Sequence, residues 1–399
     1  MTWGSLLSML AVGAPTVSID SCGLCGPLPA PIARMAQQVE DRHKKDLDGD
    51  VKLGREVAEQ VAKEMPPSEN RASIERVQRI GQELASIANA QLVSVSWGDP
   101  RLNPFSYEFT VLQGKDVNAF SLPGGFIYLY EGLVDFAESD DELAGVLAHE
   151  IAHASFRHVA YLRREQSKLD VINIPLILAA IFSRSRDAGA IVQGTGLVNQ
   201  AVLSGWSVKA EEAADYGGLQ YMLVSRYNPV GILTFMERLA FRDRGRPVND
   251  WGIYQTHPPS SDRAQALLSR LRALKIELRR SEVTTSLRSS VVPGDDGTVE
   301  LLFGKNRVYA FGGSEALTRA DEAAVALNAL MDSVPALYEL SLRNGTEVFG
   351  QGRQILEALP ADGEQPEAKA QAAFQALRRI IFDLNYKLWP NHDRAAFPG

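Results

Sequence analysis

Apolar and polar residues alternate along the chain with two different periods. Residues 53–62 and 74–90 carry apolar side chains at the spacing of amphipathic helices. Residues 91–112 and 117–130 alternate instead as short strands do, with turn residues between the runs. Helical spacing returns and dominates residues 138–280. The pattern therefore predicts an α+β fold in which a small β-sheet lies within a mostly helical domain.

Shifts in composition divide the chain into three blocks. Residues 1–45 have the composition of a leader and linker, and residues 46–290 hold the predicted helices and sheet. A Pro-, Gly- and Asp-rich interruption at residues 291–298 marks a domain boundary. Residues 291–399 then show two strand-like segments and two long amphipathic helices, which predicts an α/β accessory domain of unknown role. No repeat of 20–50 residues is evident, so a solenoid is not expected.

The overall composition narrows the class of protein. With 45% hydrophobic and 23% charged residues among 399, the chain is typical of a globular protein, which excludes extended disorder and a multi-span membrane protein. The net charge of −8 argues against binding to nucleic acid, because such proteins carry a basic surplus. The two cysteines, Cys22 and Cys25, are too few for a disulfide scaffold. A local disulfide or two unreacted thiols is favoured over a redox or metal pair.

Two apolar runs bear on the location of the protein. Residues 6–14 have the length of the apolar part of a signal peptide, although no Lys or Arg precedes them. An export signal is favoured over a disordered tail, which predicts a periplasmic or secreted protein, with the cytoplasm as the alternative. The second run, residues 172–182, contains Pro175 and is too short to span a bilayer. It is expected to form a buried or interfacial segment.

A metal-binding motif lies in the central helical region. Ser139 and Glu142 form the pattern of a capping box, so a helix is expected to begin there. His149, Glu150 and His153 follow within it as H-E-x-x-H. At about 100° per residue the two histidines lie one turn apart on the same face, so both reach one metal ion. Glu150 falls beside them, where a carboxylate polarises a metal-bound water.

The alternative is an exposed helix face that happens to carry two histidines. With six histidines in the chain, a chance H-E-x-x-H is expected in fewer than about one such sequence in a hundred. The apolar neighbours Leu143, Val146, Leu147 and Ile151 also predict a half-buried helix. A metal site, with zinc as the ion, is therefore the favoured interpretation.

A catalytic zinc needs a third protein ligand, and an acidic pair downstream offers one. Glu211 and Asp215 are four residues apart in a helix-prone run, so they share a face. One can bind the metal while the other accepts the N–H of a ligand histidine. Glu212 points about 100° away and is the weaker candidate. His158 lies nine residues after His149, at about 180° on the helical wheel, so it is expected to face away from the metal.

These segments resemble the M48 metallopeptidases of the gluzincin type, most of all their soluble periplasmic quality-control branch. The likeness extends in order through LGREVAEQV, VQRIGQELA, NAFSLPGGFIYLYEGL, DELAGVLAHEIAHASFRH, EEAAD and THPPSSDR, between about residues 50 and 275. The resemblance implies a zincin-type domain at 46–290 with one zinc ion per chain. It also implies His149, His153 and Glu211 as ligands, Glu150 as general base, and Asp215 as the residue that orients a ligand histidine.

The resemblance assigns weaker roles to three further places. His257, in the H-P segment, is either a fourth ligand that keeps the enzyme latent or a donor to the oxyanion, and otherwise a turn histidine. Arg263 carries over less specifically. Asn118, Ala119 and Phe120 belong to a strand that is expected to bind substrate backbone by β-augmentation.

The chain also departs from that branch. Residues 291–399 lack the 34-residue period of the tetratricopeptide repeats found there, so partners do not transfer. The apolar segment 165–205 is either a lid over the cleft or ordinary helical packing.

Together these features predict a zinc-dependent endopeptidase that hydrolyses unfolded or misassembled proteins, with membrane-associated clients among them. The alternative is a latent or chaperone-like client-binding protein whose site is closed by His257. The oligomeric state stays open.

Overall fold

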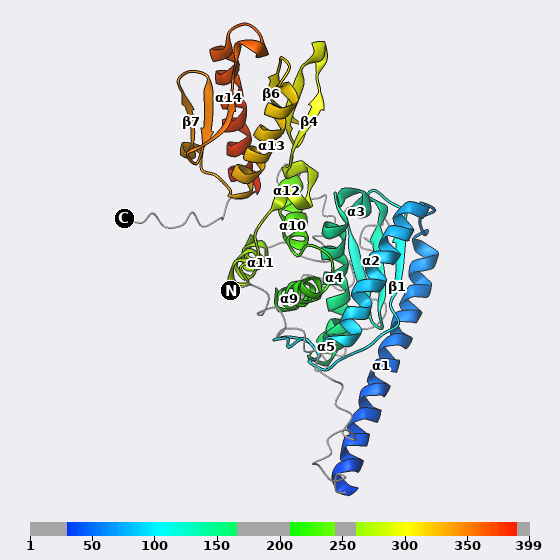
Figure 1. Ribbon diagram of the computed structural model, residues 1–399. Coiled ribbons are helices and arrows are strands. Elements are labelled where there is room, and N and C mark those ends of the chain that lie inside the picture. The colour runs from blue at the N-terminus through cyan, green and yellow to red at the C-terminus, as the bar shows by residue number, and fades with distance from the viewer. Residues whose placement is uncertain (1–29, 166–207, 244–260, 389–399) are drawn as a thin grey trace, which may run out of the picture. The chain divides into compact units, whose positions relative to one another are not determined.

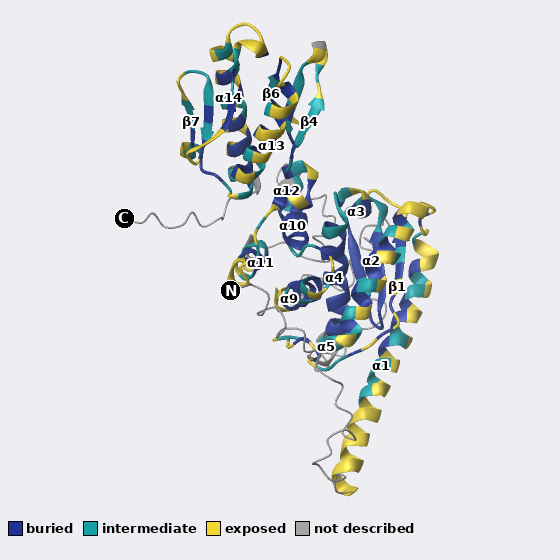
Figure 2. Cartoon of the chain, in the orientation of Figure 1, coloured by how far each residue is buried: buried dark blue, intermediate teal, exposed yellow. Residues whose placement is uncertain are grey.

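The computed structural model describes residues 30–165, 208–243 and 261–388 (Figure 1). Several residues singled out in the sequence lie outside these ranges: Cys22, Cys25, His257, the apolar run 172–182 and almost all of the segment 165–205. The chain divides into two compact units, Met1–Gly49 and Asp50–Gly399. Helix α1 (Ala30–Glu64) begins in the first unit, inside the stretch that was predicted to be a linker, and its early residues are exposed (Figure 2).

A three-stranded sheet forms the β part of the second unit before residue 280. Its strands are β1 (Glu108–Leu112), β2 (Ala119–Leu122) and β3 (Phe126–Tyr130), in the order β1-β3-β2. Strand β3 is parallel to β1 and antiparallel to β2. Val57 and Val61 of α1 pack against one face of the sheet. The two strands predicted within residues 117–130 are therefore confirmed.

Within the strand-like run at residues 91–112, residues 92–97 form no strand, and only Glu108–Leu112 does, as β1. Helix α2 (Arg71–Ala90) lies along it. Side-chain amides of this helix donate hydrogen bonds to every second backbone carbonyl of residues 105–109, from Gln78 to Phe109, from Gln82 to Tyr107 and from Asn89 to Phe105. Residues 92–97 run as a loop although their side chains alternate.

Helices enclose one central helix. Helix α4 (Asp140–Ser155) packs against α2, α9 (Val208–Val224) and α10 (Val230–Asp243), and strand β2 also lies against it. Nearly all of its residues are buried (Figure 2). In the described residues, the other helices before the C-terminal region are α3 (Glu131–Phe136), α5 (His158–Glu165), α11 (Ser261–Ala273) and α12 (Arg280–Val283).

The predicted N-terminus of the central helix is confirmed, with one change in its capping. Ser139 Oγ accepts a hydrogen bond from the backbone N–H of Glu142. The Glu142 carboxylate, however, accepts from the backbone N–H of Glu138, one residue earlier than in a capping box, and pairs with Arg238. Burial raises the pKa of Glu142 to about 7 despite the favourable charge of Arg238.

The C-terminal region contains two halves with the same order of elements, three antiparallel strands followed by a helix. The first half is β4 (Ser289–Pro293), β5 (Val299–Phe303), β6 (Asn306–Phe311) and α13 (Ala316–Asp332). The second is β7 (Leu340–Arg343), β8 (Glu347–Gly350), β9 (Arg353–Glu357) and α14 (Pro366–Asp383). Short 3₁₀ turns lie at residues 285–287, 295–297, 337–339 and 360–362, and a π-helical turn at Leu384–Leu388.

The duplication appears in the order of the elements, although no repeat of 20–50 residues is evident in the sequence. Gly297 and Gly345 occupy the same place in the two halves, two residues before the second strand, and both have positive φ. The interruption at residues 294–298 is the turn between β4 and β5, inside the first sheet.

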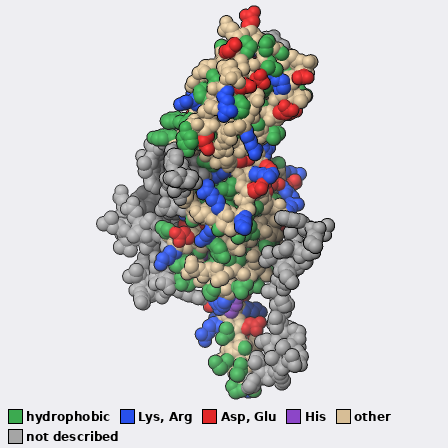
Figure 3. Space-filling view, turned by 60° about the vertical axis from the view of Figure 1, so that its left-hand side comes forward, with side chains coloured by type: hydrophobic (Ala, Val, Ile, Leu, Met, Phe, Trp, Pro, Cys, Tyr) green, Lys and Arg blue, Asp and Glu red, His purple; other side chains and the backbone are tan. Residues whose placement is uncertain are grey.

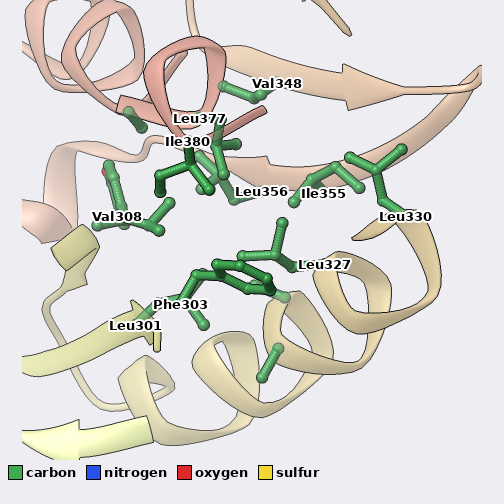
Figure 4. Packing of buried hydrophobic residues seen from close by; sticks show 14 of the residues in the cluster. Leu301, Phe303, Val308, Leu327, Leu330, Val348, Ile355, Leu356, Leu377 and Ile380 are labelled. Carbon is green, nitrogen blue, oxygen red and sulfur yellow. The ribbon is translucent and has the colours of Figure 1, made fainter. Parts of the chain in front are cut away.

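The two halves share one core. Helix α13 packs on β4 and β5 and also on β9, whereas α14 packs on β7, β8 and β6. Leu301, Leu327, Ile355 and Leu377 therefore meet in a single buried cluster (Figure 4). The core and the observed elements confirm the α+β class. No helix in the described ranges is both long and apolar enough to cross a membrane. Charged side chains of both signs are interspersed on the face shown in Figure 3.

Buried polar contacts join the segment just before this region, residues 280–286, to the preceding helices. The Arg280 guanidinium pairs with Glu237 of α10 at 2.7 Å, and both are buried. Glu138, two residues before the start of α4, accepts hydrogen bonds from the hydroxyl of Thr284 and from the backbone and hydroxyl of Ser286. Burial opposes ionisation, but these bonds and Arg238 lower the pKa of Glu138 to about 2. The start of the central helix is thus tied to residues 284–286.

Candidate metal centre

Two histidines and one glutamate converge in the interior. His149 and His153 lie one turn apart on α4, with their Nε2 atoms 3.0 Å apart. Glu211, in the first turn of α9, places Oε2 3.4 Å from Nε2 of His149 and Oε1 3.3 Å from Nε2 of His153. All three are buried and form a group capable of holding a metal ion. The three ligands that the resemblance implied are therefore brought together.

The donor set fits zinc. Zinc binds imidazole nitrogen and carboxylate oxygen at about 2.0–2.2 Å in a tetrahedral arrangement, which separates neighbouring ligand atoms by about 3.3 Å. The separations of 3.0, 3.3 and 3.4 Å match that requirement. Two nitrogens and a carboxylate also leave the fourth tetrahedral position for water or substrate, as catalytic zinc sites require.

Two adjacent glycines allow α9 to bring Glu211 this close to α4. A β-carbon at Gly218 would lie 3.0 Å from the backbone nitrogen of His149, and one at Gly217 would lie 2.4 Å from the Phe156 ring. Side chains at these positions would push the two helices apart. The close packing of α9 on α4 therefore depends on the sequence Gly217-Gly218 as much as on Glu211 itself.

Asp215 supports the first histidine. Its Oδ1 lies 2.9 Å from Nδ1 of His149, the ring nitrogen on the side away from the other two ligands. Burial disfavours the imidazolium, but the hydrogen bonds and charges of Asp215 and Glu211 raise the pKa of His149 to about 9. Asp215 thus lies beside Nδ1 of His149, whereas Glu211 lies beside the Nε2 atoms of both histidines.

Arg263, for which the resemblance implied only a weak role, contacts both carboxylates. Its Nε and Nη2 each lie 2.7 Å from an oxygen of Asp215, and its Nη1 lies 2.9 Å from Oε2 of Glu211. Burial raises the pKa of Asp215, but Arg263 and His149 outweigh it and lower that pKa to about 2. The charges of Asp215, Glu211 and Glu150 together raise the pKa of Arg263, against burial. Asp215 therefore stays ionised.

His158 does not join the group of metal ligands, but it lies against one of them, which the helical wheel did not predict. Its Nδ1 lies 2.9 Å from Nδ1 of His153, and its ring is fully buried. The helical wheel does not apply, because α4 ends at Ser155 and Arg157 adopts a left-handed backbone with φ of 54°. The chain turns there and brings His158 back against His153.

Ion pairs hold that turn in place. The Arg157 guanidinium lies 2.5 Å from Oδ2 of Asp50 and 2.9 Å from Oδ2 of Asp99. The backbone N–H of Asp99 donates to the carbonyl of Phe156, and the Trp97 ring lies 5.1 Å from that of His158. Sequence analysis missed this support. The only hint in the sequence is the Arg-His pair after the H-E-x-x-H motif, and no known spacing links such a pair to the motif.

The proposed base and substrate strand lie close to the metal ligands in the fold. Glu150 follows His149 on α4 and is fully buried. Asn118 precedes β2, whereas Ala119 and Phe120 belong to it, and all three side chains are buried. Strand β2 is at the edge of its sheet, and no strand of the described chain pairs with its outer side. His257 lies outside the described residues.

Comparisons with known proteins agree with this geometry. A beta-barrel assembly-enhancing protease of Escherichia coli is 30% identical over 171 residues, which cover 40% of this chain and 34% of that protein. The mitochondrial metalloendopeptidase OMA1 of Schizosaccharomyces pombe is 30% identical over 42% of this chain and 47% of its own length. Metalloprotease YcaL of Escherichia coli is 28% identical over 56% of this chain and 81% of its own length. The chain spans about a third of the beta-barrel assembly-enhancing protease.

The model of peptidase family M48 matches residues 72–271, half of the chain. This range runs from α2 to α11 and contains every residue of the candidate metal centre. The chain therefore belongs to peptidase family M48.

Proposed function

We propose that the protein is a zinc-dependent endopeptidase that hydrolyses peptide bonds of unfolded or misassembled proteins. The observation that carries the proposal is the convergence of His149 Nε2, His153 Nε2 and a Glu211 carboxylate at separations that suit tetrahedral zinc. Membership of a peptidase family supports the same activity. One zinc ion per chain is expected.

Glu150 is the general base of the proposed reaction. Bound zinc supplies Lewis acidity, which lowers the pKa of a bound water to about 7 and polarises the scissile carbonyl. Glu150 accepts the proton of the attacking water and delivers it to the leaving amine. Its buried position on the helix of both histidines keeps the carboxylate away from bulk water. His257 is proposed to donate to the oxyanion or to close the site as a fourth ligand.

The edge of β2 is the proposed substrate site. An extended peptide added to this edge forms main-chain hydrogen bonds, which do not depend on the sequence of the substrate. Such binding suits unfolded chains, which expose their backbone. One relative is named for enhancing β-barrel assembly, and this favours misassembled proteins as substrates. Together with the apolar run at residues 6–14, it favours a periplasmic or secreted location.

The test is cleavage of a labelled, unfolded casein by the zinc-loaded full chain, beside the variant Glu150→Gln. We expect cleavage by the wild type and a loss of at least about 100-fold in the variant, since general base catalysis contributes that much. Both proteins should hold one zinc ion. Glu212→Gln, at an exposed neighbouring carboxylate of α9, is the matched control and should stay active.

Equal cleavage by the wild type and Glu150→Gln would contradict the assignment of the base. Zinc binding without cleavage by either protein would favour the client-binding alternative. In that case His257→Ala distinguishes a latent enzyme from a client-binding protein, because release of a fourth ligand restores activity only to a latent enzyme.

A further inference from the structure

A second imidazole lies directly behind the ligand His153. His158 Nδ1 is 2.9 Å from His153 Nδ1, a hydrogen-bonding distance between two ring nitrogens. The rings meet edge to face, with centroids 4.9 Å apart, and both side chains are buried. We propose that His158 is a positioning residue that fixes the tautomer and ring orientation of His153 for metal binding. The proposal rests on the metal centre of the proposed function.

The chemistry of the ligand decides which nitrogen donates. His153 points Nε2 toward His149 and Glu211, so metal binding uses the Nε2 lone pair. A neutral imidazole that binds through Nε2 carries its proton on Nδ1, and that N–H needs a buried acceptor. His158 Nδ1 is at the right distance to accept it. His158 must then carry its own proton on Nε2, and this pairing selects the tautomer of His153 that metal binding requires.

His158 is not an additional ligand. The atom it contacts is Nδ1 of His153, on the opposite side of the ring from the Nε2 atom that faces His149 and Glu211. A metal ion held by those three residues is therefore separated from His158 by the width of the His153 ring. The contact acts on the metal only through the ligand.

The surroundings of His158 restrict its ring to this position. The left-handed backbone at Arg157 aims the next side chain back toward α4, and Asp50 and Asp99 hold the guanidinium that stabilises the turn. The Trp97 ring lies against His158 at 5.1 Å. Gly98 lets this loop approach, because a β-carbon there would lie 2.9 Å from the Phe156 carbonyl oxygen. A side chain fixed this firmly orients its hydrogen-bond partner.

The experiment compares His158→Phe with His158→Asn in the full chain. Phenylalanine keeps a buried aromatic ring but removes the acceptor, whereas the Asn amide oxygen can occupy the place of Nδ1. The measurement is the zinc dissociation constant, by competition with a chromophoric chelator. Loss of such a ligand-orienting partner typically weakens metal binding 10–100-fold. We expect a loss of about that size for His158→Phe and a clearly smaller loss for His158→Asn.

Two further readouts separate positioning from packing. The visible absorption of the cobalt(II)-loaded proteins reports ligand geometry, and we expect it to change in His158→Phe and to resemble the wild type in His158→Asn. Thermal unfolding of the metal-free proteins reports packing alone. Wild-type zinc affinity in His158→Phe would overturn the proposal. Equal weakening of zinc binding in both variants, with unchanged cobalt spectra, would also overturn it.

Failure of this inference is distinguishable from failure of the proposed function. No substrate is used, so tight zinc binding without peptide cleavage would refute the endopeptidase and leave the role of His158 standing. Peptide cleavage by the wild type, together with equal zinc affinity in the wild type and His158→Phe, would support the endopeptidase and refute the role of His158. A wild type that binds no zinc would overturn both.

Discussion

The two histidines of the candidate metal centre are supported in opposite ways. His149 donates toward a carboxylate, Asp215, which another helix supplies and Arg263 neutralises. His153 meets a second imidazole, His158, which the same stretch of chain supplies just after the helix ends. One side is a charged network assembled from distant segments, and the other is a local turn. The two histidines are alike as ligands but have different hydrogen-bond partners, so the spacing of the ligands alone does not define the centre.

The charge difference has a physical consequence. Glu211 and Asp215 are both buried, and Arg263 is within 2.9 Å of each. A second carboxylate behind His153 would add a further buried negative charge, and burial of unpaired charge is costly. The nearby guanidinium of Arg157 is already paired with Asp50 and Asp99. A neutral acceptor at His158 orients its ligand without adding charge.

The largest effect is expected when the charged side loses its cation. Arg263→Met leaves Asp215 and Glu211 buried without their guanidinium, and the loss of one partner of a buried pair costs about 3–5 kcal/mol. Urea unfolding of the metal-free variant should show a loss of that size. Zinc should restore part of it, because the ion neutralises the same carboxylates. A loss of unfolding free energy below about 1 kcal/mol would show that Arg263 does not stabilise the buried carboxylates of Asp215 and Glu211.

Acid should weaken the charged side through Asp215. Its folded-state pKa of about 2 is below the unfolded value of 3.8, so its stabilising contribution is present above about pH 4. That contribution is lost as the pH falls through about 2, and it amounts to about 2 kcal/mol. In Asp215→Asn the metal-free protein should show a shallower fall in unfolding free energy between pH 4 and pH 2. Identical slopes in the two proteins would contradict the assignment.

A smaller effect is expected from crowding the imidazole side. Gly98 has φ of 115°, and a β-carbon would approach the Phe156 carbonyl and the His158 ring. Gly98→Ala should therefore lower the unfolding free energy by about 1–3 kcal/mol and weaken zinc binding. Gly49→Ala is the matched control, since no atom lies within 4 Å of its β-carbon and the residue is helical. Equal stability of the two variants would show that the loop at residues 97–99 accommodates a β-carbon at Gly98 without strain.

The sequence predicts the charged surroundings of His149 well and the imidazole neighbour of His153 poorly. His149, His153, Glu211 and Asp215 follow helical spacing within α4 and α9, and a resemblance to a family supplies the pairing of the two helices. His158 required knowledge that α4 ends at Ser155. Nothing in the residue type of Arg157 announces a left-handed backbone, which Gly or Asn adopt far more readily. The helical wheel was therefore extended three residues beyond the end of α4.

The same limit explains the errors elsewhere in the fold. Residues 92–97 alternate as a strand does but run as a loop, and the carbonyls that α2 binds belong to residues 105–109. The duplicated C-terminal halves share the pairs Gly297-Thr298 and Gly345-Thr346 at the same place. Periodicity reports only local structure, so it predicts neither which segments pair nor that two segments share a fold.

The most direct test of the metal centre is zinc content after dialysis, in the wild type, Glu211→Ala and Glu212→Ala. These two glutamates are neighbours on α9, but one is buried against the histidines and the other is exposed. The structure predicts one zinc ion per chain in the wild type and in Glu212→Ala, and loss of zinc from Glu211→Ala. Unchanged zinc content in Glu211→Ala would contradict the centre built on His149, His153 and Glu211.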